Sequence, residues 1–161
     1  MAGLGLAVLR LTLAVALLAH GLHQLSGMFA GPGNGPGGLN TTAAYFSGLG
    51  LEPGFAFAVL ASTLQVLGGL LIAIGLLTRW AAVALLGYLG IVIWKDQLRW
   101  GFFMNWILDP TRGHGYEYSI LLAGGLLCLV FAGGGDWSFD GRRANRAASR
   151  ASARARLRTR Q

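Results

Sequence analysis

The chain has 161 residues, of which 54% are hydrophobic and only 12% carry a charge. Soluble domains average about 25% charged residues. This composition, with a mean hydropathy of +0.55, all but excludes a soluble globular protein and excludes disorder for most of the chain. Cys128 is the only cysteine, which excludes an internal disulfide, a CxxC redox pair and a cysteine-based zinc site.

The net charge of +7 is unevenly distributed along the chain. Residues 141–161 hold eight arginines and no acidic residue, so residues 1–140 carry five basic and six acidic residues, a net charge of −1. The sequence pI of 10.8 therefore reflects the tail. The body is nearly neutral, and its charge does not indicate nucleic-acid binding.

Four apolar stretches are long enough to cross a bilayer, which takes about 20 residues per helix, or a few fewer when flanking residues snorkel. Arg10 and two histidines interrupt the first stretch, whereas the second is uncharged throughout. We therefore predict an all-α integral membrane protein built as a four-transmembrane-helix bundle. The predicted spans are residues 3–25, 55–77, 80–94 (extending to 98) and 118–132.

The segment between the first two spans contains a loop and a short helix. Residues 31–38 have the sequence Gly-Pro-Gly-Asn-Gly-Pro-Gly-Gly, which cannot hold a helix and indicates a long loop. Residues 40–51 are predicted to form an amphipathic helix at the membrane interface, with Tyr45 and Phe46 facing lipid.

The segments between the later predicted spans are shorter, apart from one long loop. Pro53 is expected to start the second span, because proline is tolerated in a first helical turn. Residues 78–79 are predicted to form a tight turn into the third span. Residues 99–115 indicate a second long loop, and the three glycines at 133–135 are expected to end the fourth helix.

The distribution of aromatic and basic residues predicts the orientation. Trp94, Trp100, Trp106, Tyr116 and Tyr118 belong to one predicted interface, and Trp80 and Trp137 belong to the other. The loops at 26–54 and 96–117 hold two arginines, whereas the opposite side carries Arg10, Arg79 and the tail arginines. The positive-inside rule thus predicts a multi-pass protein of the plasma membrane with both termini in the cytoplasm. A cleaved signal peptide over residues 1–20 is the alternative, which the interrupting Arg10 disfavours.

Polar side chains in apolar spans are costly and mark candidate functional residues. His20, Gln65 and Glu117 meet this criterion, and with Trp106 of the second long loop they are our candidates for lining a ligand pocket. A neutral imidazole both donates and accepts hydrogen bonds, which suits a quinone carbonyl or hydroxyl. The alternative for Gln65 is an interhelical hydrogen bond, and for the helix-end groups it is contact with water and neighbouring loops.

A metal site and an autonomous catalytic site are not expected. His20, His23, His114 and Glu117 carry imidazole and carboxylate groups suited to zinc, copper or iron, but histidines three residues apart do not by themselves select a metal. The sequence contains no nucleotide-binding loop, no nucleophile elbow and no paired-carboxylate hydrolase pattern. The catalytic residues, if any, are therefore left open.

Several short motifs, in this order and spacing, resemble the DoxX family over about residues 4–140. His20 and Gly21 match a His-Gly motif at the end of the first helix. The family's Gly-Gly-Leu-Leu run and its Gly-Leu-Leu-Thr-Arg turn are matched at residues 68–71 and 75–79, and a subgroup's Gly-Phe-Phe-Met-Asn-Trp motif at residues 101–106. The ending Gly-x-Gly-x-x-Ser-x-Asp is matched at residues 133–140.

The resemblance implies a four-helix membrane domain over residues 1–140 and a membrane subunit of an oxidoreductase system. Such systems handle thiosulfate, thiols or oxidative stress and are linked to quinone, with a partner protein supplying the electron carrier. Many family members have a glutamate where this chain has Gln65, so a proton-carrying role there is not expected. Distant relatives act as cargo receptors, which leaves a non-catalytic scaffold or receptor, binding a partner through the outer loops, as the alternative.

The tail, residues 141–161, is rich in Arg, Ala and Ser. We expect it to be cytoplasmic, disordered in water and partly helical on anionic lipid, since each arginine near such a surface contributes about 1 kcal/mol. Anionic lipid is thus the expected partner of the tail, and nucleic acid is not.

Overall fold

The computed structural model describes residues 2–31, 35–109 and 111–158, and its regular elements there are helices, which confirms the predicted all-α class. Residues 32–34 of the first predicted loop lie outside the described part. The elements are α1 (Ala2–Ser26), α2 (Leu39–Gly48), α3 (Gly54–Ile74), α4 (Thr78–Lys95), the 3-10 helix η1 (Gln97–Trp100), α5 (Glu117–Ala132) and α6 (Phe139–Arg158).

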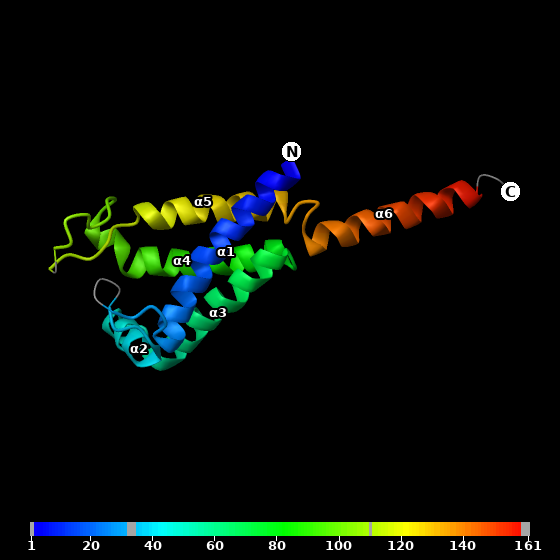
Figure 1. Cartoon of the computed structure of the whole chain (residues 1–161). Helices are drawn as coiled ribbons and strands as arrows, with labels where there is room; N and C mark the ends of the chain where they lie inside the picture. Colours follow the sequence, from blue (N-terminus) through cyan, green and yellow to red (C-terminus); the bar gives the residue numbers. More distant parts are fainter. Residues whose placement is uncertain (1, 32–34, 110, 159–161) are drawn as a thin grey trace.

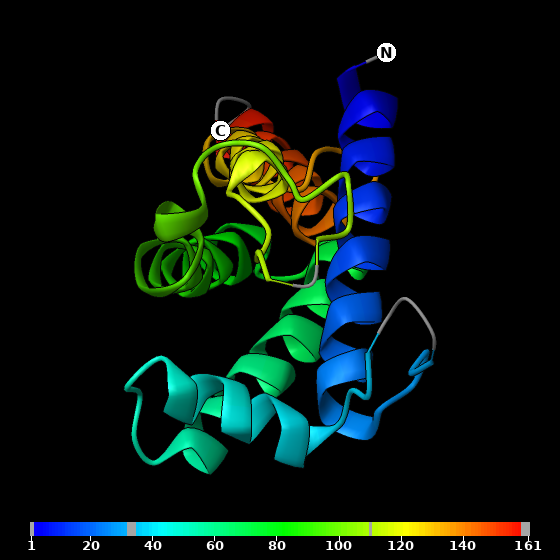
Figure 2. The same ribbon diagram turned by 90° about the vertical axis from the view of Figure 1, so that its left-hand side faces the viewer.

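Helices α1, α3, α4 and α5 pack into one bundle (Figure 1). Helices α4 and α5 lie side by side, and the paired helices α1 and α3 cross them at an angle. Helix α2 packs on α3 at the end of the bundle that also carries both long loops (Figure 2). The start of α1, the α3–α4 turn and the α5–α6 junction lie at the opposite end.

The surface of the bundle has the character expected of a protein in lipid. Residues 3–26 of α1 and 54–74 of α3 form helices long and apolar enough to cross a membrane, and α5 is apolar but shorter, with 16 residues. Only 28% of the apolar window of α1 and 39% of that of α3 is buried, whereas a core helix of a soluble protein hides most of its surface. Large apolar patches on a surface indicate contact with lipid or with another protein.

The turn between α3 and α4 differs from the prediction. Helix α3 ends at Ile74, and Gly75 caps it in the left-handed conformation, with φ of 71°, which glycine adopts without steric cost. The predicted turn at residues 78–79 is wrong, because both residues belong to the first turn of α4. Pro53 also precedes α3 as its N-cap instead of lying within its first turn.

The side chain of Asp140 explains where α4 begins. Its carboxylate accepts hydrogen bonds from the backbone N–H groups of Leu77 (3.1 Å) and Thr78 (3.0 Å) and from the Thr78 hydroxyl (3.1 Å). The Asp140 N–H in turn donates to the carbonyl of Gly75 at 3.0 Å. A carboxylate at a helix N-terminus satisfies free N–H groups and interacts favourably with the positive end of the helix dipole. Through these bonds Asp140 joins the start of α6 to the α3–α4 turn.

Helix α2 is more buried than expected. The predicted lipid-facing position of Phe46 is wrong, because its ring is 3% exposed and packs with Ala58 and Ala61 of α3. Tyr45 donates a hydrogen bond from its hydroxyl to Asp96 at 2.7 Å. The small alanines of α3 leave room for the aromatic face of α2, so the short helix docks on the bundle instead of on lipid.

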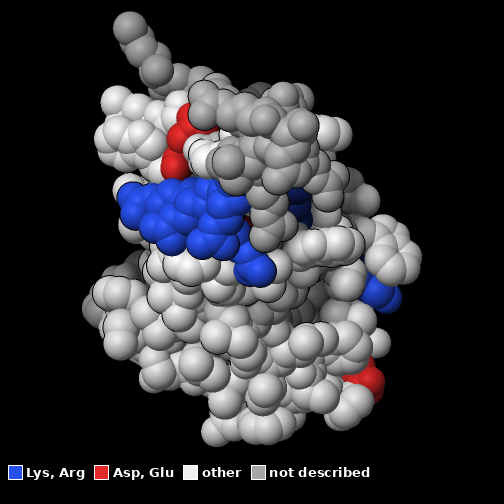
Figure 3. Space-filling model, turned by 90° about the vertical axis from the view of Figure 1, so that its right-hand side faces the viewer, with Lys and Arg blue, Asp and Glu red and all other residues white. Residues whose placement is uncertain are grey.

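Helix α6 begins at Phe139 and runs into the tail. The expected domain boundary after residue 140 therefore falls inside the first turn of this helix. Residues 141–158 are helical in the structure. Alanine and arginine are good helix formers, and residues 142–150 are exposed along the whole stretch. Figure 3 shows most of the basic surface of this face gathered over α6, with the remaining surface almost uncharged.

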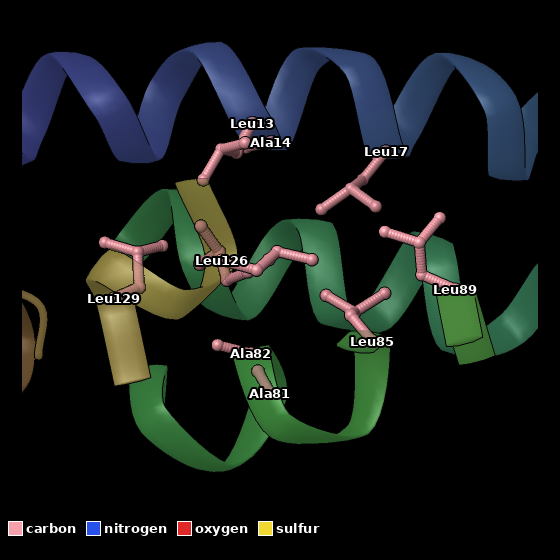
Figure 4. Packing of buried hydrophobic residues seen from close by; sticks show 10 residues of the cluster. Leu13, Ala14, Leu17, Ala81, Ala82, Leu85, Leu89, Leu126 and Leu129 are labelled. Carbon is pink, nitrogen blue, oxygen red and sulfur yellow. The ribbon is translucent and has the colours of Figure 1, made fainter. Parts of the chain in front are cut away.

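The core of the bundle is made of small and branched apolar residues from all four long helices (Figure 4). Glycines let these helices approach: a Cβ at Gly68 would lie 2.9 Å from a Leu85 methyl carbon, and one at Gly125 would lie 2.9 Å from a Leu13 methyl carbon. Close packing of this kind drives association in lipid, where apolar burial alone gives little. The buried core residues are Leu13, Ala14, Leu17, Ile72, Ala81, Ala82, Leu85, Leu89, Leu126 and Leu129.

Gly21 marks the tightest approach of α1 to α3. A Cβ there would lie 2.9 Å from the backbone nitrogen of Val66 and 3.0 Å from the Cβ of Gln65, so the backbone of one helix would have to move. The glycine of the His-Gly motif therefore has a packing role beside the polar interior.

Replacing Gly21 by alanine should destabilise the bundle by about 1–3 kcal/mol, the usual cost of overpacking. Gly124→Ala is the matched control on α5, since a Cβ there meets no atom within 4 Å and alanine is favoured over glycine in a helix by about 0.8–1.0 kcal/mol. Thermal unfolding of the detergent-solubilised protein measures both. Equal midpoints for the two variants would show that the α1–α3 approach is not tight.

Candidate functional site

A cavity of about 210 Å³ lies between α1, α3, α4 and α5, with α2 and η1 closing the end that carries the long loops. Leucines from α1, α4 and α5 form its apolar side. The other described lining residues include several polar side chains but no Lys, Arg, Asp or Glu. The hydrogen-bonding residues are His20, Gln24, Tyr45, Gln65, Tyr88, Gln97, Tyr118 and Ser119.

A hydrogen-bond network joins three helices at the polar side of this cavity. The amide nitrogen of Gln65, on α3, donates to Oε1 of Gln24 at 2.7 Å and to the hydroxyl of Tyr88 at 3.2 Å. It also lies 3.3 Å from the carbonyl oxygen of Ala61. Gln65 is 4% exposed, so it makes the interhelical bonds foreseen as its alternative role and also presents its side chain to the cavity.

His20 stands at the rim of the cavity. Its ring packs against that of Tyr118, with centroids 5.9 Å apart and planes at 48°. The residue is exposed on the outside of the bundle, where it also borders a second hollow with Ala19 and His23. The imidazole therefore separates the polar interior from the surroundings of the bundle.

Gln97 contributes a group without a partner. Its Oε1 atom is buried and forms no hydrogen bond with any described residue, although the side chain lines the cavity. Burying an acceptor in this way costs free energy. Sequence reasoning missed Gln97 and Tyr88. The available signal was a polar group within the third predicted span, Tyr88, and another in the extension of that span to residue 98, Gln97.

Asp96 fixes the end of α4 next to this group. Its two carboxylate oxygens accept hydrogen bonds from Tyr45 (2.7 Å), Arg99 (2.7 Å) and the Trp100 indole (3.2 Å). Burial and the hydrogen bond to Asp96 raise the pKa of Tyr45 above its usual range, so the phenol stays protonated and keeps donating. The carboxylate charge is thereby held away from the cavity by three donors.

The other two pocket candidates are Trp106, in the long loop after α4, and Glu117, the first residue of α5. Trp106 is 71% exposed, and Glu117 accepts a hydrogen bond from the backbone N–H of Met104 at 3.2 Å. The structure thus brings His20 and Gln65 to the cavity but places Trp106 and Glu117 elsewhere.

Asn105 organises that loop. Its buried amide nitrogen donates to the carbonyls of Asp109 and Arg112, both at 2.7 Å, and its Oδ1 accepts from the Asp109 N–H at 3.0 Å. Asp109 is half-buried, and the hydrogen bonds that its carboxylate accepts from Thr111 lower the pKa of its carboxyl. The Gly-Phe-Phe-Met-Asn-Trp motif therefore supplies the residue that braces the loop.

Over the described residues, no three His, Cys, Asp or Glu side chains meet as a group able to hold a metal ion. Of the four weighed for this role, His23 contacts the carbonyl oxygen of Met28 through Nδ1 at 3.1 Å. His114 is exposed in the loop, and Glu117 is bonded to Met104. These residues do not form a ligand set with His20.

Comparison with known proteins agrees with the motifs. The family model of DoxX matches residues 5–96, more than half of the chain, and so covers α1 to α4 with the Gln24–Gln65–Tyr88 network. No curated protein and no solved structure matches the chain. The extent of the family match and the apolar helices establish that the chain belongs to the DoxX family of membrane proteins.

Proposed function

We propose that the cavity binds the headgroup of a quinone or quinol and that the chain is a membrane subunit of an oxidoreductase system. The observation that carries this proposal is the lining: neutral donors and acceptors face apolar residues, and the buried Oε1 of Gln97 has no partner among the described residues. A quinol hydroxyl is a donor that would satisfy this oxygen. A charged ligand would find no opposite charge on these walls.

The size of the cavity supports a single ring. Its volume is about 210 Å³, and a cavity of about 150 Å³ can hold one benzene molecule. Larger ligands such as nucleotides need sites of roughly 300–1,000 Å³. His20 and Tyr118 line the cavity, and both are exposed on the bundle surface, so an isoprenoid tail would leave between them toward lipid.

The cavity residues would have different roles in binding the ring. Gln65 and Gln97 would hold the two oxygens of the ring, and His20 at the rim would exchange protons with the outside, because an imidazole can both accept and donate a proton. A quinone supplies two-electron redox chemistry when bound. The electron carrier that reduces or oxidises it would come from a partner protein.

Quinone binding can be tested on the purified full chain. Its bound quinones and quinols would be extracted and quantified, and a short-chain quinol, whose hydroxyls can donate to Gln97, would be titrated by isothermal calorimetry. Gln97→Leu should weaken binding about fivefold to tenfold, the effect of losing one hydrogen bond of about 1 kcal/mol, without lowering thermal stability, because its Oε1 has no partner among the described residues. Trp106→Ala, outside the cavity, is the control and should bind as the wild type does. Absence of quinone from the wild-type protein and no heat of binding would rule the proposal out.

We also propose that α1, α3, α4 and α5 all cross the membrane, with both termini in the cytoplasm. Supporting observations are that both long loops lie at one end of the bundle (Figure 1) and that most basic residues lie at the other. Arg79 and Lys95 near the two ends of α4 could snorkel to the interfaces.

Cysteine accessibility checks this topology in intact cells. In a Cys128→Ser background, a cysteine at Thr111 should react with a membrane-impermeant maleimide, and one at Ser149 should react only after the membrane is opened. Labelling of Ser149→Cys from outside would reverse the orientation, and labelling of both from outside would require an odd number of spans.

A scaffold role is the second candidate, and the loop after α4 favours it. Its tip exposes Trp106 (71%), Ile107 (82%) and Leu108 (78%) on a segment braced by Asn105. Leu108 is held at a φ of 53°, a conformation that costs a branched residue about 1–2 kcal/mol. A rigid apolar tip of this kind suits a protein partner at the loop end of the bundle.

Photocrosslinking tests this second role. A crosslinking amino acid at Ile107 should capture one defined partner in cells, whereas the same group at the exposed Thr111 should not. Ile107→Asp should abolish capture while leaving quinone binding unchanged. Equal crosslinking from both positions would indicate random encounters and would remove the basis for this candidate.

A further inference from the structure

The base of α6 carries an arginine-lined hollow that the cavity function does not use. It measures about 550 Å³ and is lined by Phe139, Arg142, Arg143, Arg146, Ala147 and Arg150. All four arginines are exposed, and none forms an ion pair within the described part of the chain. Figure 3 shows this basic cluster where α6 leaves the bundle.

We infer that this hollow binds the phosphate headgroup of an anionic phospholipid and so anchors the inner end of the bundle. This inference rests on the membrane arrangement proposed above. Guanidinium groups bind phosphate oxygens through paired, charge-assisted hydrogen bonds. The ring of Phe139, 59% exposed, would lie against the glycerol or acyl region of the same lipid.

Aromatic residues at this end of the bundle mark the expected depth of the headgroups. Trp80 is 75% exposed and Trp137 is 62% exposed, and tryptophan concentrates at the boundary between lipid and water. Trp80 is the third residue of α4, and Trp137 immediately precedes the Ser138–Asp140 junction. The lipid phosphates should therefore surround the first turns of α6.

The Asp140 junction holds the hollow at that level. The carboxylate binds Thr78 and Leu77 at the start of α4, and the Ser138 hydroxyl accepts from the N–H of Gly141 at 2.8 Å. These hydrogen bonds tie the base of α6 to the bundle. The arginines at the base of α6 are therefore held at a defined depth relative to the lipid headgroups, instead of on a free tail.

The length of α6 separates its arginines into two groups. At 1.5 Å per residue, Arg142 to Arg146 lie within ~10 Å of Phe139 along the axis, comparable to a headgroup layer of ~5–8 Å plus the reach of an arginine side chain. Figure 1 shows α6 running on, away from the bundle. The backbone of residues 151–158 of α6 therefore lies farther from the lipid phosphates than the base of the helix.

Lipid binding to the full chain in detergent, followed by native mass spectrometry, tests this assignment. The probes are phosphatidylglycerol and, as the neutral comparison, phosphatidylcholine. Replacing Arg142, Arg143 and Arg146 together by glutamine should remove the preference for phosphatidylglycerol, by up to about fivefold per arginine, which corresponds to about 1 kcal/mol each.

The control replaces Arg154, Arg156 and Arg158 by glutamine, which removes the same charge farther along the chain. This variant should keep the lipid preference within twofold, and circular dichroism should give equal helix content for the two triple variants. Neither triple variant should alter quinone binding. A negative result for the lipid site would therefore leave the cavity proposal standing, and a negative result for quinone binding would leave the lipid site standing.

Four outcomes would overturn the lipid site. Equal losses in both triple variants would indicate general attraction by the tail, and equal binding of the two lipids would remove the charge argument. Competition by millimolar inorganic phosphate would indicate a site for small anions. Tighter binding of an RNA oligonucleotide, lost in both triple variants, would assign α6 to nucleic acid.

Discussion

The buried amide of Gln65 is the constraint on which the rest of the interior depends. In an apolar interior an unpaired amide costs several kcal/mol, so α3 has to be placed where Gln24 of α1 and Tyr88 of α4 can reach it. Each such bond contributes only about 0.6 kcal/mol on average, but the penalty for leaving the group alone is larger. The network therefore fixes the position of three helices, and Gly21 supplies the close approach that makes it reachable.

Most of the fold could be predicted because apolar length and helix-breaking residues act locally. The four long helices, the short helix after the first loop and the glycine stop after α5 all follow from such signals. The predicted turn between α3 and α4 was wrong because Asp140, more than 60 residues away, caps α4 at Thr78. A contact between distant segments leaves no mark in the local pattern.

The candidate site was predicted in part for the same reason. His20 and Gln65 are polar groups inside apolar stretches, which is a local signal, and both line the cavity. Trp106 and Glu117 have equally suitable side chains. However, Trp106 is exposed on the loop surface, and Glu117 accepts a hydrogen bond from the loop backbone at Met104. Phe46 packs inward because Ala58 and Ala61 leave space on α3. Such partners are decided by three-dimensional packing, so hydrophobicity and spacing could not identify them.

The described residues of the cavity wall include no charged side chain, and this constrains what such a site can do. Burying a carboxylate at the position of Gln65 would require a counter-charge or a bound proton, and its properties would then depend on pH. An amide keeps the same donors and acceptors at every pH, so the Gln24–Gln65–Tyr88 network can hold a neutral ring without changing its own protonation. Proton exchange is then restricted to a group in contact with the outside, and His20, exposed at the rim, is the imidazole in that position. At the proposed quinone site, Gln65 would therefore separate ligand binding, in the interior, from proton transfer, at the surface.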